Sequence, residues 1–191
     1  MKKTFIICFL LGLGLIVNSQ KSTPAKKNTP KTYIEQFKDD AVKIMHETGV
    51  PASIVLGVAM HESACGNSIL ATNLNNQFGV KGESRIVYVR NKKKVSTLYK
   101  RYGSVYDSFQ DFSRIMLERS EFNGLIEKLT HFDYSGWAHG IQKNGYASDK
   151  KWSRGVLRII EKYHLYDFDE KPDTQAVASR QADIPSIIKA K

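Results

Sequence analysis

The stretch Gly57-Val58-Ala59-Met60-His61-Glu62-Ser63-Ala64-Cys65-Gly66 ends the most apolar helical segment in the sequence. Pro51 stands where a first helical turn tolerates proline, and Ile54, Val55, Val58 and Ala59 continue the segment. A helix that is apolar almost all round is predicted to be buried, so this segment is the expected centre of the fold. A carboxylate within it, Glu62, is the first candidate for chemistry.

Other segments show helical periodicity on either side of this one. Thr32 and Glu35 have the spacing of a capping box, and a helix is predicted from there to Gly49. Ser104 opens another helix, and further helices are predicted over residues 122–129, 137–142 and 148–163. Between Arg85 and Tyr99, β-branched and aromatic residues flank a basic tip, which indicates a hairpin. The predicted fold is mostly α, of the α+β class, with a small inserted hairpin lobe.

The two ends of the chain differ from its middle. Lys2 and Lys3 precede an apolar run from Phe5 to Val17, which is typical of a signal peptide over residues 1–19 and too short for an ordinary membrane span. A retained N-terminal anchor is the alternative. Residues 20–31 read as a polar linker, residues 32–168 as one domain, and residues 169–191 as a flexible tail.

Charge and cysteine content exclude several kinds of protein. The formal net charge is +10, which favours polyanionic surroundings, but no nucleic-acid-binding motif is visible. Removal of the signal leaves Cys65 as the one cysteine, so no intramolecular disulfide can form. The histidines are too scattered for a recognisable metal-ligand set. We therefore expect no metal, no cofactor, no nucleic-acid partner and a monomeric chain.

Glu62 can be interpreted in two ways. Partial burial among apolar neighbours and the C-terminal end of the helix dipole would both favour the protonated carboxyl, which is what a general acid requires. Alternatively, Glu62 is a surface glutamate on the polar edge of its helix.

The motifs that follow Glu62-Ser63 favour the first interpretation. They are Asn75-Asn76-Gln77-Phe78-Gly79-Val80-Lys81-Gly82, then Arg101-Tyr102-Gly103, then Gly145-Tyr146-Ala147-Ser148-Asp149. In kind and order these blocks resemble the glucosaminidase family of peptidoglycan hydrolases, glycoside hydrolase family 73, over about residues 34–166. The resemblance implies a lysozyme-like helical lobe and a hairpin lobe, with the glycan strand in the cleft between them.

The resemblance also implies roles for individual residues. Glu62 would be the catalytic acid, and Tyr146 would lie beside it to orient the N-acetyl group or stabilise the transition state. Asn76, Phe78, Tyr102 and Asp149 would contact substrate. Simpler roles stay open for three of these, because Tyr146 and Phe78 could belong to the core and Tyr102 could tie the two lobes together.

The second carboxylate that most glycosidases use is not evident. The family tends to supply it from the β-lobe, whereas the hairpin from Arg85 to Lys100 contains no Asp or Glu. Glu83 just before the hairpin and Asp107 just after it are the candidates, although Asp107 and Asp149 could be helix-capping charges. If neither acts, the acetamido oxygen of the substrate could be the nucleophile.

We therefore expect an exported endo-beta-N-acetylglucosaminidase, in the periplasm, the cell envelope or the medium. It would cleave the β-1,4 bond between N-acetylglucosamine and N-acetylmuramic acid of peptidoglycan. A muramidase or lytic transglycosylase is the nearest alternative, and a catalytically weak wall-binding or assembly module is the alternative from another class. The sequence does not separate wall remodelling from a toxin role.

Overall fold

The structure, a computed structural model, describes residues 27–90 and 92–169. The predicted signal peptide, most of the linker and almost all of the predicted tail lie outside the described residues. Among the helices of the described part, none is long and apolar enough to cross a membrane.

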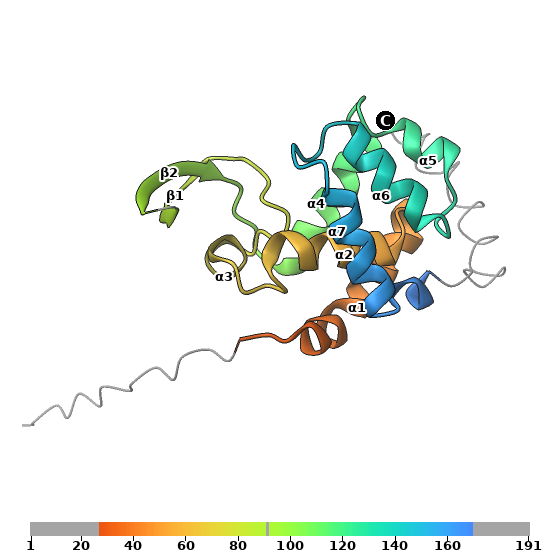
Figure 1. The fold of residues 1–191 in the computed structure, drawn as a ribbon, viewed down its shortest axis with the longest axis horizontal. Helices are drawn as coiled ribbons and strands as arrows, with labels where there is room; N and C mark the ends of the chain where they lie inside the picture. The colour runs from red at the N-terminus through yellow and green to blue at the C-terminus, as the bar shows by residue number, and fades with distance from the viewer. Residues whose placement is uncertain (1–26, 91, 170–191) are drawn as a thin grey trace, which may run out of the picture.

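The fold is mostly helical with one two-stranded sheet, as predicted (Figure 1). The elements in chain order are α1 (Pro30–Thr48), α2 (Ala52–Ser63), α3 (Ile69–Leu74), β1 (Ser84–Arg90), β2 (Lys93–Tyr99), α4 (Val105–Glu118), α5 (Gly124–Lys128), α6 (Tyr134–Lys143), α7 (Trp152–Lys162) and a 3-10 turn, η1 (Leu165–Phe168). The short α3 and η1 were not among the predicted elements.

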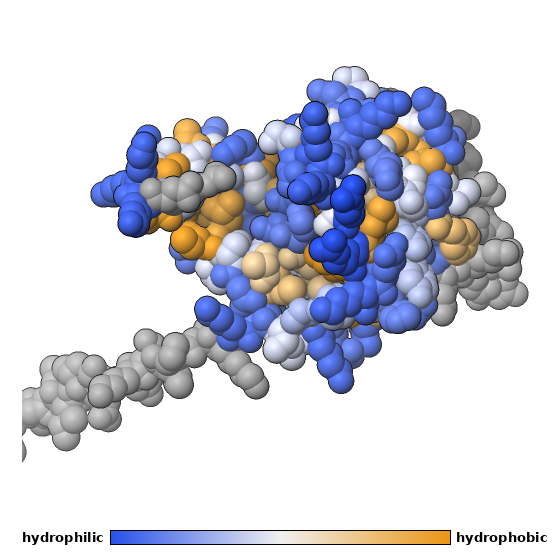
Figure 2. All heavy atoms as spheres, in the orientation of Figure 1, coloured by the Kyte–Doolittle hydropathy of each residue, from blue (hydrophilic) through white to orange (hydrophobic). Residues whose placement is uncertain are grey.

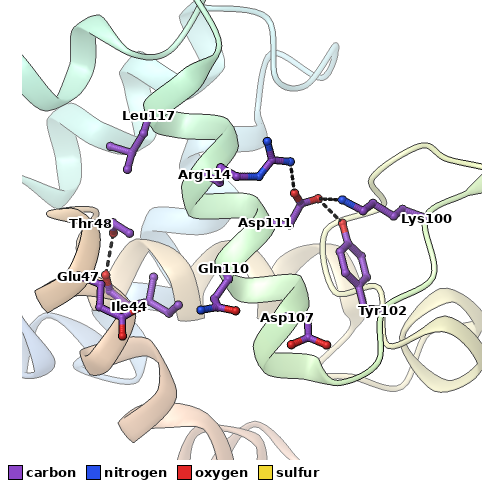
Figure 3. A pocket seen from close by; sticks show the side chains of 10 residues that line it. All are labelled: Ile44, Glu47, Thr48, Lys100, Tyr102, Asp107, Gln110, Asp111, Arg114 and Leu117. Atoms are coloured by element: carbon purple, nitrogen blue, oxygen red, sulfur yellow. Dashed lines mark hydrogen bonds and ion pairs between the residues drawn. The ribbon is translucent and has the colours of Figure 1, made fainter. Parts of the chain in front are cut away.

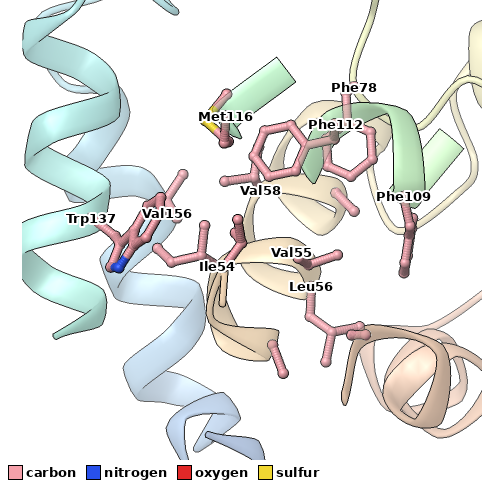
Figure 4. Close-up of a cluster of buried hydrophobic side chains, with 14 of the residues drawn as sticks. Ile54, Val55, Leu56, Val58, Phe78, Phe109, Phe112, Met116, Trp137 and Val156 are labelled. Carbon is pink, nitrogen blue, oxygen red and sulfur yellow. The ribbon is translucent and has the colours of Figure 1, made fainter. Parts of the chain in front are cut away.

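Helix α2 is the centre of the helical lobe. It packs against α1, α4, α6, α7 and η1, and nearly all of its residues are buried. Gly57 allows α7 to approach closely, because a Cβ at this position would stand 2.7 Å from Cγ1 of Ile160. Figure 4 shows side chains from α2, α4, α6 and α7 meeting in one core, where Phe78 stacks on Phe112 with ring centroids 4.3 Å apart. The buried apolar helix predicted from the sequence is confirmed.

The hairpin is antiparallel and projects away from the helices (Figure 1). Its register pairs Ser84 with Tyr99 at the base and Arg90 with Lys93 near the tip. Residues alternate between exposed and half-buried along both strands, as expected for an arm with one covered face. Figure 2 shows apolar side chains on this arm, where Val87, Val89 and Leu98 are exposed.

Four predicted helix starts were wrong. Helix α5 begins at Gly124 instead of Phe122, and α6 begins at Tyr134 instead of Trp137. Helix α1 begins at Pro30, because Thr29 rather than Thr32 is its N-cap: the Thr29 hydroxyl accepts from the Thr32 amide, and the Thr32 hydroxyl accepts from the Thr29 amide. The first turn of α1 thus begins within the segment assigned to the linker. Helix α7 begins at Trp152 instead of near Ser148, because residues 145–151 form a turn that enters the site described below.

Candidate active site

Glu62 lies at the one end of α2 that reaches the surface. Every residue of α2 is buried except His61 and Glu62, and the helix ends at Ser63, after which Ala64 adopts a left-handed conformation. The partial burial predicted for Glu62 was wrong, since this residue is exposed. The apolar residues of α2 face the core, and its last turn carries His61 and Glu62 out to solvent.

Trp152 holds the Glu62 carboxyl. The indole Nε1–H at the start of α7 donates to Oε1 of Glu62 at 2.6 Å, and Trp152 as a whole is only 3% exposed. Trp152 is not among the site residues predicted from the sequence, so this contact was missed. The available signal was chemical: a buried indole N–H needs an acceptor, and this one comes from another helix.

Tyr146 lies against the same tryptophan. Its ring centroid is 5.2 Å from that of Trp152, and its edge contacts Phe112 and Phe122. The hydroxyl donates weakly to the carbonyl of Phe78, at 3.4 Å. Burial raises the pKa of Tyr146 well above its ordinary value, and the nearby charge of Glu62 acts in the same direction. Tyr146 therefore presents a neutral phenol beside the carboxyl.

A cavity of about 710 Å³ joins these groups and lies between the helical lobe and the base of the hairpin. It brings together Glu62, Phe78, Tyr146 and Asp149 of the predicted site residues. The rest of its lining is His61, Leu70, Gly79, Val80, Lys81, Tyr99, Ile115, Arg119, Phe122, Gly145, Ala147, Ser148 and Trp152. Phe78 is at once a cavity wall and part of the core, being 4% exposed.

Asn76 and Tyr102 lie outside this cavity and hold the hairpin to the helices. The buried Asn76 amide donates to the carbonyls of Val80 (2.9 Å) and Lys100 (2.8 Å), and its oxygen accepts from the Val80 amide. Tyr102 is buried as well, and its hydroxyl donates to Asp111 at 2.7 Å. The structure thus places Asn76 in a supporting position, and Tyr102 in the lobe-tying position that the sequence left open.

The candidate second carboxylates differ in location. Glu83 is exposed just before β1 and is not part of the cavity lining. Asp107 accepts from the amide of Ser104, the N-cap of α4, and lines a different hollow. Asp149 does line the cavity, and its Oδ1 accepts from the Lys151 amide at 2.9 Å. Glu62 and Asp149 are the carboxylates that line this cavity.

Within residues 27–90 and 92–169, no three His, Cys, Asp or Glu side chains are grouped closely enough to hold a metal ion. The groups of the cavity lining that can take part in acid–base chemistry include the carboxyls of Glu62 and Asp149 and the phenols of Tyr99 and Tyr146.

A carboxyl at the exposed end of a buried helix, in a cleft bounded by a hairpin lobe, is the arrangement of lysozyme-like glycoside hydrolases. The family model described as mannosyl-glycoprotein endo-beta-N-acetylglucosaminidase matches residues 38–165. Since this match covers more than half of the chain, the chain belongs to the glucosaminidase family.

Characterised relatives support this assignment. Exo-glucosaminidase LytG of Bacillus subtilis is 28% identical over 151 residues, which are 73% of this chain and 54% of the relative. Peptidoglycan hydrolase FlgJ of Vibrio parahaemolyticus is 23% identical over 154 residues, 73% of this chain and 49% of the relative. The chain thus spans about half the length of these curated relatives.

Solved structures share the fold. The catalytic domain of the autolysin Auto from Listeria monocytogenes superposes with a TM-score of 0.62 at 19% identity, covering 75% of this chain and 91% of that one. The glycoside hydrolase domain of FlgJ from Salmonella typhimurium superposes with a TM-score of 0.58 at 21% identity, covering 84% and 97%. The predicted lysozyme-like fold is therefore confirmed.

Proposed function

We propose that this chain hydrolyses peptidoglycan as an endo-beta-N-acetylglucosaminidase, cleaving the β-1,4 bond between N-acetylglucosamine and N-acetylmuramic acid. Support for the substrate comes from relatives that are named peptidoglycan hydrolases. The single observation that carries the chemistry is the Glu62 carboxyl, exposed at the end of α2 in the cavity and hydrogen-bonded to Trp152.

In this proposal Glu62 is the general acid. Because the Trp152 indole occupies Oε1, the proton to be donated sits on Oε2. As the bond between the anomeric carbon and the glycosidic oxygen breaks, this proton passes to the departing oxygen of the next sugar. Trp152 contributes by fixing the carboxyl in one rotamer before substrate binds.

The nucleophile in this proposal is the carbonyl oxygen of the substrate's own acetamido group. It forms a bond to the anomeric carbon while the glycosidic bond breaks, and the phenol of Tyr146 orients the acetamido group. Water then attacks the anomeric carbon, its proton goes to the Glu62 carboxylate, and the acetamido group is restored. Support for this route is the position of Glu83 and Asp107 outside the cavity lining, together with the hydrogen bond that Asp149, the other carboxylate of the lining, accepts from the Lys151 amide.

We also propose that the protein acts outside the cytoplasm, where peptidoglycan lies. The support is the signal-peptide pattern of the first 19 residues, Lys2 and Lys3 before an apolar run.

The fragments released from purified peptidoglycan test which bond is cleaved and whether cleavage is endo or exo. The proposal predicts soluble fragments whose reducing ends, marked by borohydride reduction and identified by mass spectrometry, are N-acetylglucosamine. Fragments of many lengths early in the reaction indicate endo cleavage, whereas early release of single terminal units would match the exo activity named for the Bacillus subtilis relative.

Reducing ends of N-acetylmuramic acid, or anhydro ends, would contradict the proposal and identify a muramidase or a lytic transglycosylase. Wall binding without any release would identify a binding module. Glu127→Gln, the same isosteric change at an exposed residue of α5, serves as a matched control for Glu62→Gln.

A further inference from the structure

A second hollow of about 190 Å³ adjoins the cavity that holds Glu62. The two share Val80, Lys81, Ile115 and Arg119 in their linings, so they form one continuous groove along α4. The remaining residues of the second hollow are Lys100, Asp111, Arg114 and Glu118. A glycan held at Glu62 therefore has a side pocket within reach of its substituents.

The second hollow is basic. Four cationic side chains line it, Lys81, Lys100, Arg114 and Arg119, against the two carboxylates Asp111 and Glu118. This imbalance favours an anionic ligand, because cations gathered in a hollow attract negative charge more strongly than the same cations spread over an open surface.

Both carboxylates are already engaged within the protein. Asp111 accepts from Tyr102 at 2.7 Å and Lys100 at 3.0 Å, and it pairs with Arg114, as Figure 3 shows. Burial would raise the pKa of Asp111, but the hydrogen bonds from these three residues outweigh it and hold the pKa below its usual value. Asp111 is thus ionised and satisfied at neutral pH.

Glu118 is likewise paired, with Arg114 at 2.6 Å. Lys100 and Arg114 are therefore each paired with a neighbouring carboxylate.

Lys81 and Arg119 are the two cations left over. Lys81 lies over the ring of Tyr99, with Nζ 3.9 Å from the centroid, and contacts the hydroxyl of Thr97 at 3.3 Å. Arg119, the exposed C-cap residue of α4, forms no ion pair within the part of the chain that the structure describes. Both residues line the cavity that holds Glu62 and also the second hollow. Two cations that have no acidic partner among residues 27–90 and 92–169 thus lie at the junction of the two spaces.

We propose that Lys81 and Arg119 form an anion subsite that binds a carboxylate of the muramyl side of the substrate while Glu62 acts on the neighbouring glycosidic bond. This inference rests on the proposed function, which supplies the glycan. The intended ligand is a carboxylate of the stem peptide, because the peptide branches from the glycan and can enter a side pocket. The lactyl carboxylate exposed when the peptide is removed has the same chemistry.

The test compares the double variant Lys81→Gln/Arg119→Gln with the charge-matched control Lys128→Gln/Arg158→Gln, whose residues are exposed and line neither space. Three substrates are used: intact peptidoglycan, peptidoglycan whose carboxylates have been converted to amides with carbodiimide and ammonia, and amidase-treated glycan without peptides. The readout is kcat/KM for cleavage, with kcat and KM resolved separately.

On intact peptidoglycan we expect the double variant to lose about tenfold in kcat/KM, mainly through KM, while the control pair keeps wild-type values. On the amidated substrate the wild type should fall to the level of the double variant. If the difference in kcat/KM between the wild type and the double variant disappears on peptide-free glycan, the stem peptide is the source of the carboxylate. If this difference persists there, the lactyl group is the source.

An equal loss for the double variant on all three substrates, or no loss on any, would overturn the subsite. Failure of the wild type to cleave any of the three would instead overturn the proposed function, so the two failures are distinguishable.

Discussion

The indole nitrogen of Trp152 lies 2.6 Å from a carboxyl oxygen of Glu62, across 90 positions of sequence. This contact links the first residue of α7 to the last turn of α2, and the close packing of α7 on α2 at Gly57 supports it. The position of the acid therefore depends on how two helices pack. Trp152 acts on the reaction through Glu62 and is a positioning residue.

Replacement of this indole should impair catalysis more than binding. Trp152→Phe keeps an aromatic ring against Tyr146 but removes the N–H donor. Loss of one hydrogen bond to a charged group, about 1.5–3 kcal/mol, corresponds to roughly 10- to 100-fold in kcat. Steady-state kinetics on peptidoglycan fragments should show this fall with little change in KM, and the alkaline limb of the pH–rate profile, where a general acid loses its proton, should move.

The matched control is Trp137→Phe. Trp137 is fully buried in α6, and its indole donates to the carbonyl of Thr130 at 3.1 Å, away from the cavity. This variant should lower the free energy of unfolding while the pH–rate profile keeps its shape. A Trp152→Phe enzyme with a wild-type kcat and pH profile would show that the contact has no catalytic consequence.

Tyr146→Phe tests the hydroxyl of Tyr146 separately from its ring. The ring contacts with Phe112, Phe122 and Trp152 remain, so the thermal unfolding midpoint should change little. Because the hydroxyl is proposed to orient the acetamido group, kcat should fall about tenfold or more. Full activity in this variant would assign Tyr146 to the core alone.

Gly57→Ala should destabilise the protein. Its new Cβ would stand 2.7 Å from Cγ1 and 3.1 Å from Cδ1 of the buried Ile160, so α2 and α7 must separate or Ile160 must repack. Overpacking of this kind costs about 1–3 kcal/mol. Denaturant unfolding should show the loss, whereas Gly124→Ala, whose Cβ would meet only the end of Lys128 at 3.8 Å, should show none.

We predict that the free energy of unfolding depends on pH because of Asp169. It is buried, 2% exposed, and accepts from the backbone amide and the hydroxyl of Ser53 at the start of α2. Burial raises its pKa from 3.8 to about 6, although the hydrogen bonds from Ser53 work against this. Between these two values the folded protein holds a proton that the unfolded chain has released, so stability falls as pH rises through this window.

Through Asp169, the free energy of unfolding is expected to fall by about 3 kcal/mol between pH 4 and pH 7. It should be visible as the difference in pH slope between the wild type and Asp169→Asn in chemical unfolding. Parallel slopes for the two proteins would contradict the assignment.

The fold was largely predictable from local patterns. The apolar stretch around α2 required burial, and the change to alternating β-branched residues after Arg85 required a hairpin. Ser104 was predicted as the start of a helix, and it is the N-cap of α4. In each case the signal lies within a few residues, where side-chain chemistry and backbone geometry are directly coupled.

The site was less predictable because it depends on tertiary packing. The contact between Trp152 and Glu62 joins two helices, and nothing in the spacing of either residue indicates the other. Glu62 was expected to be partly buried because its neighbours in sequence are apolar, but those neighbours face inward while it faces out. Asn76 lies in a turn beside the cavity, yet its amide is used entirely on the backbone.

The central claim, that Glu62 supplies the proton, is tested most directly by the rate of glycan cleavage in Glu62→Gln. Glutamine keeps an acceptor oxygen for the Trp152 indole but cannot donate a proton as an acid does. The account predicts loss of at least about a hundredfold in kcat, with unchanged pelleting on purified peptidoglycan and unchanged stability. Cleavage by Glu62→Gln at a rate within a few fold of the wild type would contradict it.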